Sequence, residues 1–412
     1  MTKAVSSPHR LAVLAPISVD SQEVIAVAAA SDHCVFTVSH RASAHVLPSV
    51  VEDDLVVDFS APDVEDQIKE FAWRRGITGI LTARDFLTPL VARLCTDLGL
   101  PSNDVDLAAG ARSKIAMAEQ FARFRVAAPQ TFVVDREAEI VDLVQSGQLN
   151  LPMVVKPAEN AGSVGVTVVG SLDELPAAVD RVRNQDGAYD LTLDQRIVVQ
   201  EYIEGNEFSV ESVTADGHTR HICVTRKATT SCGFRIEIGH SVPAHLDEPL
   251  RKGILAATDR AIQAVGIRNS VSHTEVKVRP DGQCVVVEIA ARMGGGRISV
   301  LIERALGVSI PRLAITAALG NPADATPPRK GCAVVRHLLS PAEGVLVALR
   351  NLPEIDDEVP VVSISKKPGD RVRCPQSNKA RIGHFVVIGT DETATCERAD
   401  ALLDAIEIAV AR

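Results

Sequence analysis

Short apolar segments alternate with helical stretches along the first hundred residues, and this alternation constrains the fold more than any other feature. Strands are expected at 11–15, 34–38, 55–59 and 77–82, and helices at 22–30, 64–75 and 86–98. This order is typical of an open, mostly parallel sheet covered by helices. The first strand leads into Pro16-Ile17-Ser18 without a glycine, so the phosphate-binding fingerprint of an NAD-dependent oxidoreductase is absent.

Two breaks divide the chain into three expected domains. A Gly-Leu-Pro-Ser-Asn segment at 99–103 ends the first, and a proline-containing segment at 321–328 ends the second. We therefore expect domains at 1–104, 105–325 and 326–412, in keeping with about 150 residues per domain. The second is expected to begin with a helix at 112–124 and to be rich in strands from 131 to 213. The third is expected to hold strands at 333–338, 361–365 and 384–388 and a closing helix at 392–410.

Charge and cysteine usage exclude several classes of protein. The 43 basic and 53 acidic residues give a net charge of −10, which disfavours general binding to nucleic acid or to an anionic membrane. No apolar run approaches the roughly 20 residues that span a bilayer. The first 20 residues are interrupted by Pro16 and Asp20, so we expect a β-strand there rather than a signal peptide. Eight scattered cysteines without a C-x-x-C pair indicate reduced thiols in a cytoplasmic enzyme.

The first candidate site follows an apolar strand at 153–157 that ends in Lys156-Pro157. A loop of small residues comes next, with Gly162, Ser163 and Gly165, and leads into another strand. The backbone N–H groups of such a loop can bind phosphate oxygens. No G-K-[ST] sequence is present, so this is not a Walker A loop. The alternative is a mobile hairpin tip without a ligand.

A second segment, at 198–211, is a strand that ends in a glycine turn between carboxylates. Its residues Glu201, Tyr202 and Ile203 could offer backbone groups to a purine edge, and Glu207 could bind ribose hydroxyls. The alternative is a solvated acidic turn between two strands.

A third segment is predicted to be a β-hairpin, with arms at 273–278 and 285–292. Period-two alternation places Glu275 on one face of its strand with His273 and Lys277, and Glu288 likewise shares a face with Ala290 and Arg292. The two carboxylates can therefore converge from paired strands. Two carboxylates on paired strands repel each other unless a cation lies between them, and oxygen ligands of this kind suit Mg²⁺. The alternative is a cross-strand pairing of glutamate with lysine or arginine.

Two further stretches carry polar groups beside glycines. Gly294, Gly295 and Gly296 precede a predicted helix, where free N–H groups can bind an anion, or can simply form a tight turn. Glu237 lies on a strand with His240 three residues later. A histidine in this position can act as a base or can be structural.

Taken in this order, the motifs resemble the ATP-grasp superfamily and, within it, the bacterial L-amino acid ligases that make dipeptides. The residues that carry the resemblance are Lys156-Pro157, Gly162-Ser163-x-Gly165, Glu201-Tyr202-Ile203-x-Gly205-x-Glu207, Glu275 and Glu288-x-x-x-Arg292. The resemblance implies an α/β fold with an open parallel pre-ATP-grasp sheet, a two-subdomain ATP-grasp core and a small C-terminal α+β domain. It also implies a mobile lid at about 131–204.

The resemblance further assigns roles to residues. Lys114 and Lys156 would contact ATP phosphates, and the loop with Gly162, Ser163 and Gly165 would close over them. The remaining assignments are Glu201, Tyr202 and Ile203 for adenine, Glu207 for ribose, Glu275 and Glu288 for Mg²⁺ or Mn²⁺, Arg292 for the acyl-phosphate, Glu237 and His240 for the substrate amine, and Gly294 and Gly295 for a substrate carboxylate.

Three positions depart from the family pattern. Ala290 replaces an asparagine that serves as a further metal ligand, and Ser113 replaces an aspartate before the first lysine. Relatives can carry a bulky residue at the position of Gly296, and glycine there should leave more room in the acceptor pocket.

The activity implied is ATP-dependent amide formation between a small carboxylic acid and an amine, both expected to be amino acids. The reaction would pass through an acyl-phosphate and release ADP and phosphate. The alternatives are a carboxylase or purine-biosynthesis type of enzyme that uses bicarbonate or formate, and a non-catalytic ATP-binding protein. A homodimer is expected on base rates.

Overall fold

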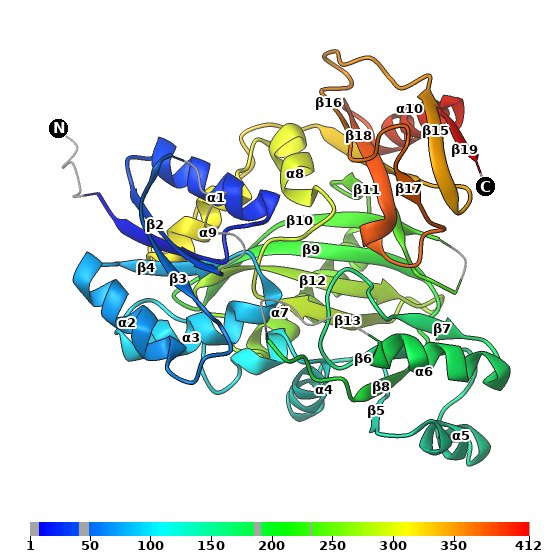
Figure 1. The fold of residues 1–412 in the computed structure, drawn as a ribbon, viewed down its shortest axis with the longest axis horizontal. Coiled ribbons are helices and arrows are strands. Elements are labelled where there is room, and N and C mark those ends of the chain that lie inside the picture. The colour runs from blue at the N-terminus through cyan, green and yellow to red at the C-terminus, as the bar shows by residue number, and fades with distance from the viewer. Residues whose placement is uncertain (1–7, 41–48, 185–190, 231–232, 412) are drawn as a thin grey trace.

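The computed structural model describes residues 8–40, 49–184, 191–230 and 233–411, which form an α/β fold with four sheets (Figure 1). The N-terminal sheet has the order β3-β2-β1-β4 and is parallel throughout, as expected. Its strands are β1 (Arg10–Leu14), β2 (Cys34–His40), β3 (Val51–Val57) and β4 (Gly79–Thr82). Its helices are α1 (Val19–Ala30), α2 (Val64–Arg75) and α3 (Thr88–Asp97).

A second sheet, the lid sheet, has the order β5-β8-β6-β7 and is antiparallel. It consists of β5 (Thr131–Val134), β6 (Met153–Pro157), β7 (Thr167–Val169) and β8 (Ile197–Glu201). Two helices, α5 (Glu137–Gln145) and α6 (Leu175–Arg183), interrupt a region that was expected to be mostly strand. In α6 the buried residues are Leu175, Ala178, Val179 and Val182. This spacing of three and four is helical, so the sequence did contain the signal for α6.

The central sheet has eight strands in the order β13-β12-β9-β10-β11-β14-β18-β16. From the middle of the chain come β9 (Asn206–Ala215), β10 (His218–Thr229), β11 (Glu237–Val242), β12 (Ser270–Val278) and β13 (Cys284–Ala290). The C-terminal region adds β14 (Cys332–Leu339), β16 (Val361–Ile364) and β18 (Arg381–Gly389). Because β11 pairs with β14, the sheet is continuous across the domain boundary expected near residue 326.

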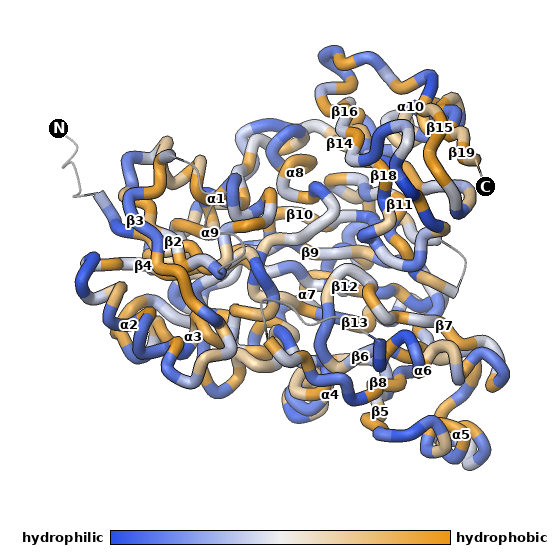
Figure 2. Tube along the Cα trace, viewed as in Figure 1, coloured by the Kyte–Doolittle hydropathy of each residue, from blue (hydrophilic) through white to orange (hydrophobic). Residues whose placement is uncertain are grey.

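Helices cover both faces of the central sheet. On one side α7 (Glu248–Ala264) packs against β12 and β13 with Phe208 and Val276, and α4 (Lys114–Arg123) contacts α7. On the other side α8 (Ile298–Leu306) packs on β11 and β14. The helix α9 (Ile310–Ala318) packs on β9 and β12 and also contacts α1, so it joins the central sheet to the N-terminal sheet. Figure 2 shows hydrophobic residues on α9, which also contacts β4.

The C-terminal region also contains a small sheet of order β17-β15-β19. Its strands are β15 (Gly344–Arg350), β17 (Arg371–Val372) and β19 (Glu407–Ala411), and α10 (Glu392–Ala405) packs nearby on β14 and β18. The closing helix expected at 392–410 was therefore wrong at its end, since it stops at Ala405. The final residues instead pair with β15, and Val410 lies opposite Leu346 in that register. The described residues also contain four short 3-10 helices, at Asp85–Leu87, Ala108–Ala111, Leu172–Glu174 and Asn378–Ala380.

Within the part of the chain that the structure describes, no helix has the length and apolar character needed to cross a bilayer.

The packing of Phe208 generates the first prediction. Its side chain is fully buried in the cluster between α7 and the central sheet. Phe208→Ala should lower the free energy of unfolding by about 3–5 kcal/mol, because the cavity left behind forfeits packing as well as transfer free energy. Urea unfolding followed by circular dichroism measures this change. Trp73→Ala, at a position on α2 that is 80% exposed, is the matched aromatic control and should change stability by less than about 0.5 kcal/mol.

Candidate active site

A cavity of about 320 Å³ lies between the lid sheet and the central sheet. Its volume is in the range of small-molecule sites. Most of the residues singled out in the sequence line it, namely Lys114, Lys156, Gly162, Ser163, Glu201, Tyr202, Ile203, Glu207, Glu237, Glu275, Glu288, Arg292 and Gly295. Three do not, namely Gly165, His240 and Gly294.

Two lysines form the floor of the cavity. Lys114 is the first residue of α4, after Ser113, whose hydroxyl accepts a hydrogen bond from the backbone of Ala116 as the helix N-cap. The Nζ of Lys114 donates to the carbonyl of Asn160 at 2.9 Å. Lys156, at the end of β6, is buried, and burial together with the neighbouring Lys114 lowers its pKa to about 8. Two buried cations side by side favour a polyanionic ligand, because its charge would offset their repulsion.

Glu275 and Glu288 face each other across the β12–β13 hairpin, where the register pairs them directly. Oxygen donors on adjacent strands fit Mg²⁺, which commonly takes one or two carboxylates and completes its shell with water and substrate phosphates. Ala290 is buried and lies opposite His273, so it contributes no third side-chain ligand. The described residues contain no cluster of three or more His, Cys, Asp or Glu side chains arranged to hold a metal.

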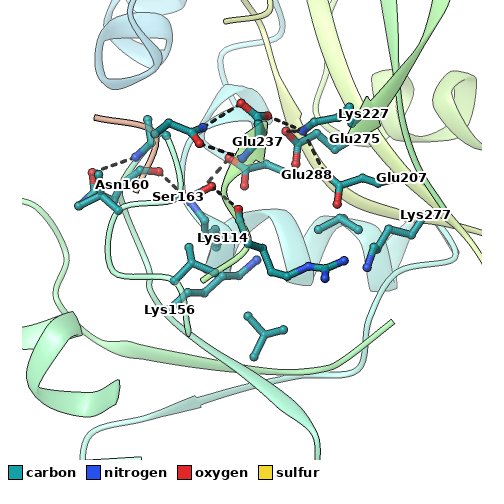
Figure 3. Close-up of a pocket in the computed structure, with 18 of the residues that line it drawn as sticks. Lys114, Lys156, Asn160, Ser163, Glu207, Lys227, Glu237, Glu275, Lys277 and Glu288 are labelled. Carbon is teal, nitrogen blue, oxygen red and sulfur yellow. Dashed lines mark hydrogen bonds and ion pairs between the residues drawn. The ribbon is translucent and has the colours of Figure 1, made fainter. Parts of the chain in front are cut away.

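Lys227, on β10, is the central cation of the cavity, and no motif in the sequence pointed to it. Its Nζ lies 2.5 Å from Glu275, 2.8 Å from Glu237 and 3.0 Å from Glu207. Figure 3 shows the three carboxylates gathered around it, with Lys114 and Lys156 on another side of the cavity. Burial alone would lower the pKa of Lys227, but the three carboxylates raise it well above its usual value. The ammonium group is therefore a fixed positive charge.

A second buried network lies behind Glu275 and also escaped the sequence analysis. His273 Nδ1 is 2.6 Å from Glu211 Oε1, and its Nε2 is 3.4 Å from Glu275. Burial would lower the pKa of His273, but the two carboxylates raise it to about 9. Gly294 packs against this pair, and a Cβ added there would lie 2.8 Å from His273 Nδ1. Gly294 therefore makes space for the network and does not line the cavity.

Arg292 is oriented by a residue of the N-terminal lobe. Its Nε and Nη2 donate to the two carboxylate oxygens of Asp85 at 2.7 and 3.2 Å, and its Nη1 donates to the carbonyl of Met293 at 2.6 Å. Although burial opposes the charged form, Asp85 raises the pKa of Arg292 further above its usual range. A bidentate pair of this kind fixes the plane of the guanidinium, and Arg292 still faces the cavity.

At the lid end of the cavity, the segment after β8 is held by two side chains from the β12–β13 hairpin. Arg279 Nη2 donates to Glu201 Oε1 at 2.6 Å, and Lys277 Nζ donates to the carbonyl of Ile203 at 2.7 Å. Lys277 also lies over the ring of Tyr202, 4.9 Å from its centroid. Glu201 and Glu207, the carboxylates expected to bind adenine and ribose, are thus both paired with cations: Glu201 with Arg279 and Glu207 with Lys227.

Glu237 lines the cavity and is held by three donors, while His240 is displaced from it. Glu237 accepts hydrogen bonds from Lys227, Asn378 and Arg381. Burial would raise the pKa of Glu237, but Lys227 and its other cationic neighbours lower it well below its usual value. His240 is buried beneath Gly296, and burial lowers the pKa of its imidazole to about 4.

The space at Gly296 is therefore not free, contrary to the expectation from the sequence. Gly296 has φ +64°, and a Cβ added to it would collide with His240 Nε2. Neither ring nitrogen of His240 has a hydrogen-bond partner within the described ranges, and Nε2 lies 3.8 Å from Glu237 Oε2. Glycine at 296 accommodates the imidazole and adds no room to the cavity.

Family models match an ATP-grasp N-terminal domain over residues 18–102, an ATP-grasp domain over 149–300 and L-amino acid ligase C-terminal domain 2 over 336–411. The chain is an ATP-grasp protein that resembles the L-amino acid ligases.

Relatives of this ATP-grasp protein are distant in sequence. An alanine–anticapsin ligase of Bacillus subtilis is 25% identical over 61% of this chain, and the match spans 56% of the length of that relative. A D-alanine–D-alanine ligase of Geobacter sulfurreducens is 30% identical over 51% of this chain and 64% of its own. The crystal structure of an L-amino acid ligase from Bacillus licheniformis superposes with a TM-score of 0.81 at 20% identity, covering 99% of this chain and 100% of that one. That likeness establishes the fold.

A row of histidines behind the cavity generates a pH prediction. His337 on β14 lies between His240 and His384, with ring centroids 5.9 and 6.0 Å away. Burial lowers the pKa of His337 to about 2, and Arg381 and His240 act in the same direction. Its imidazole is thus neutral in the folded protein at pH values where the unfolded chain binds a proton, so stability falls as the pH drops below about 6.5.

We expect the free energy of unfolding to fall between pH 7 and pH 5 by about 2 kcal/mol more in the wild type than in His337→Gln. Urea unfolding at the two pH values measures the difference. His218→Gln, on an exposed hairpin, is the matched control and should behave like the wild type. An unchanged pH dependence in His337→Gln would show that His337 is protonated equally in both states.

Proposed function

We propose that this protein is an ATP-dependent carboxylate–amine ligase that joins two amino acids through an acyl-phosphate. The observation that carries the proposal is that one cavity brings these groups together. Lys114, Lys156 and the small-residue loop line it, and so do the paired Glu275 and Glu288 together with Arg292 and Glu237. These are the groups needed to bind a triphosphate, a divalent cation, an anionic intermediate and an amine. The resemblance to L-amino acid ligases supports amino acids as substrates.

The first step is the transfer of the γ-phosphoryl group of ATP to a substrate carboxylate. An O–P bond to the carboxylate forms, and the bond to the β-phosphate breaks to release ADP. Lys114, Lys156 and Arg292 supply fixed positive charge for this transfer. Glu275 and Glu288 would hold the Mg²⁺ ion that neutralises phosphoryl charge when bound.

In the second step the amine nitrogen attacks the acyl carbon, the C–O bond to phosphate breaks, and the departing phosphate takes up the proton that the nitrogen loses. Glu237 and His240 were both expected at the substrate amine, where either could act as a base, but the pKa of each lies well below its usual value. We therefore assign Glu237 the task of orienting the amine through a hydrogen bond.

The domain organisation inferred from the sequence fits this scheme. We propose that the segment at about 131–204 moves as a lid over the 105–325 domain and keeps water from the acyl-phosphate. Exclusion of water matters because the intermediate would otherwise hydrolyse.

The substrate pair is found by a phosphate-release screen with Mg·ATP and paired amino acids, with mass spectrometry of the products. We expect release to require both an acid and an amine and to yield a dipeptide. Release that depends on bicarbonate or formate would favour a carboxylase-type enzyme, and ATP binding without release for any pair would favour a non-catalytic protein.

Glu288→Gln should lower the rate of amide formation by at least about 100-fold, because one of the two metal-binding carboxylates loses its charge. Coupled measurement of ADP and dipeptide checks this. The control is Glu204→Gln, at an exposed position in the turn after β8, which should retain activity within about twofold of the wild type. Near-normal amide formation by Glu288→Gln would contradict the metal assignment.

A further inference from the structure

A short segment of the C-terminal region reaches into the cavity. It contains the 3-10 helix Asn378–Ala380 and the first residue of β18, Arg381. Asn378 and Arg381 both line the cavity, although they lie outside all the sequence motifs that pointed to it. Their position next to the groups proposed to bind the amine requires an explanation.

Both residues hold Glu237, and they hold its main chain as well as its carboxylate. Asn378 accepts a hydrogen bond from the backbone N–H of Glu237 at 3.1 Å and donates through Nδ2 to Glu237 Oε2 at 2.8 Å. Arg381 Nη2 donates to the Glu237 carbonyl at 2.8 Å and to Oε2 at 2.9 Å. With Lys227 on Oε1, the carboxylate is fixed in one rotamer and keeps acceptor capacity on Oε1.

Asn378 also contacts the small-residue loop that contains Gly162 and Ser163. The backbone N–H of Asn378 donates to the carbonyl of Gly162 at 3.3 Å. The next residue, Ser163, donates through its hydroxyl to the carbonyl of Arg235, two positions before Glu237, at 3.3 Å. Ser163 has φ +59°, a conformation that costs free energy for a residue other than glycine and that persists only when its surroundings hold it.

We propose that Asn378 and Arg381 are positioning residues that fix Glu237 for the amine and tie its orientation to the closed position of the loop tip at Gly162. The inference rests on the proposed function and extends it. The amine site is then fully formed only when the loop covers the phosphates. An acyl-phosphate is consequently shielded from water at the moment the amine is held for attack, which limits ADP release without amide formation.

Steady-state kinetics of two substitutions test this inference. Asn378→Ala removes both side-chain contacts to Glu237 and should raise the KM for the amine by about 10-fold, while the KM for ATP changes by less than about twofold. The amide formed per ADP released should fall. Asn378→Asp should be worse than Asn378→Ala although it is nearly isosteric, because it sets a second carboxylate against Glu237 Oε2.

The matched control is Lys379→Ala, at the adjacent exposed position, which should keep both KM values and the amide yield. Equal changes in the two KM values, or an unchanged amide yield per ADP in Asn378→Ala, would overturn the inference. Absence of amide formation by the wild type itself would instead refute the proposed function.

Hydrogen exchange with bound ADP tests the same linkage without relying on activity. Asn378→Ala keeps the N–H that contacts Gly162, so only the peptide containing Glu237 should exchange faster. Asn378→Pro removes that N–H as well, and peptides covering the loop at 159–165 should then also exchange faster. The extended backbone of Ser377, with φ −160° and ψ 169°, is suited to a following proline. Unchanged exchange of the loop in Asn378→Pro would refute the tie to the loop.

Discussion

The ion cluster around Lys227 is the interaction on which the active site depends. One ammonium group contacts carboxylates from three other strands, Glu207 on β9, Glu237 on β11 and Glu275 on β12. Buried charges are tolerated only when they are paired, so the cluster restricts how these strands and their side chains can be placed. It also joins the regions assigned to nucleotide, metal and amine. A change at one of them alters the charge balance at the other two.

Other regions of the fold supply the residues that orient the remaining charged groups of the cavity. The N-terminal lobe contributes Asp85, which orients Arg292, and the C-terminal region contributes Asn378 and Arg381, which orient Glu237. The lid sheet brings Lys156 and the small-residue loop. Each region has its own hydrophobic core, but the charged residues that line the cavity come from all of these regions. An acyl-phosphate formed there would face fixed cations and little water, which is the environment that favours amide formation over hydrolysis.

The sequence alone predicted the features that depend on local pattern. Alternating apolar segments identified the parallel N-terminal sheet, and period-two alternation placed Glu275 opposite Glu288. The missed groups depend on contacts between distant segments. Lys227, Glu211 and Asp85 carry no motif, and their partners become neighbours only when strands and lobes assemble. His240 shows the converse problem, because its spacing from Glu237 suggested a base, whereas packing under Gly296 removes it from the cavity. Local sequence also indicates α6, through its apolar periodicity, and β19, through its β-branched residues, although neither element was predicted.

The central claim is that the three carboxylates require a cation among them. The most direct test is the thermal unfolding temperature of Lys227→Met, measured with EDTA and with increasing Mg²⁺. Removal of the ammonium takes away the cation that the three carboxylates share and leaves their mutual repulsion without that compensation, although Glu237 keeps Arg381 and Glu275 keeps His273. The variant should therefore unfold several degrees below the wild type in EDTA, since breaking a buried ion pair costs about 3–5 kcal/mol. Mg²⁺ should restore part of that loss and should affect the wild type much less. An unfolding temperature equal to that of the wild type in EDTA, with no response to Mg²⁺, would contradict the account.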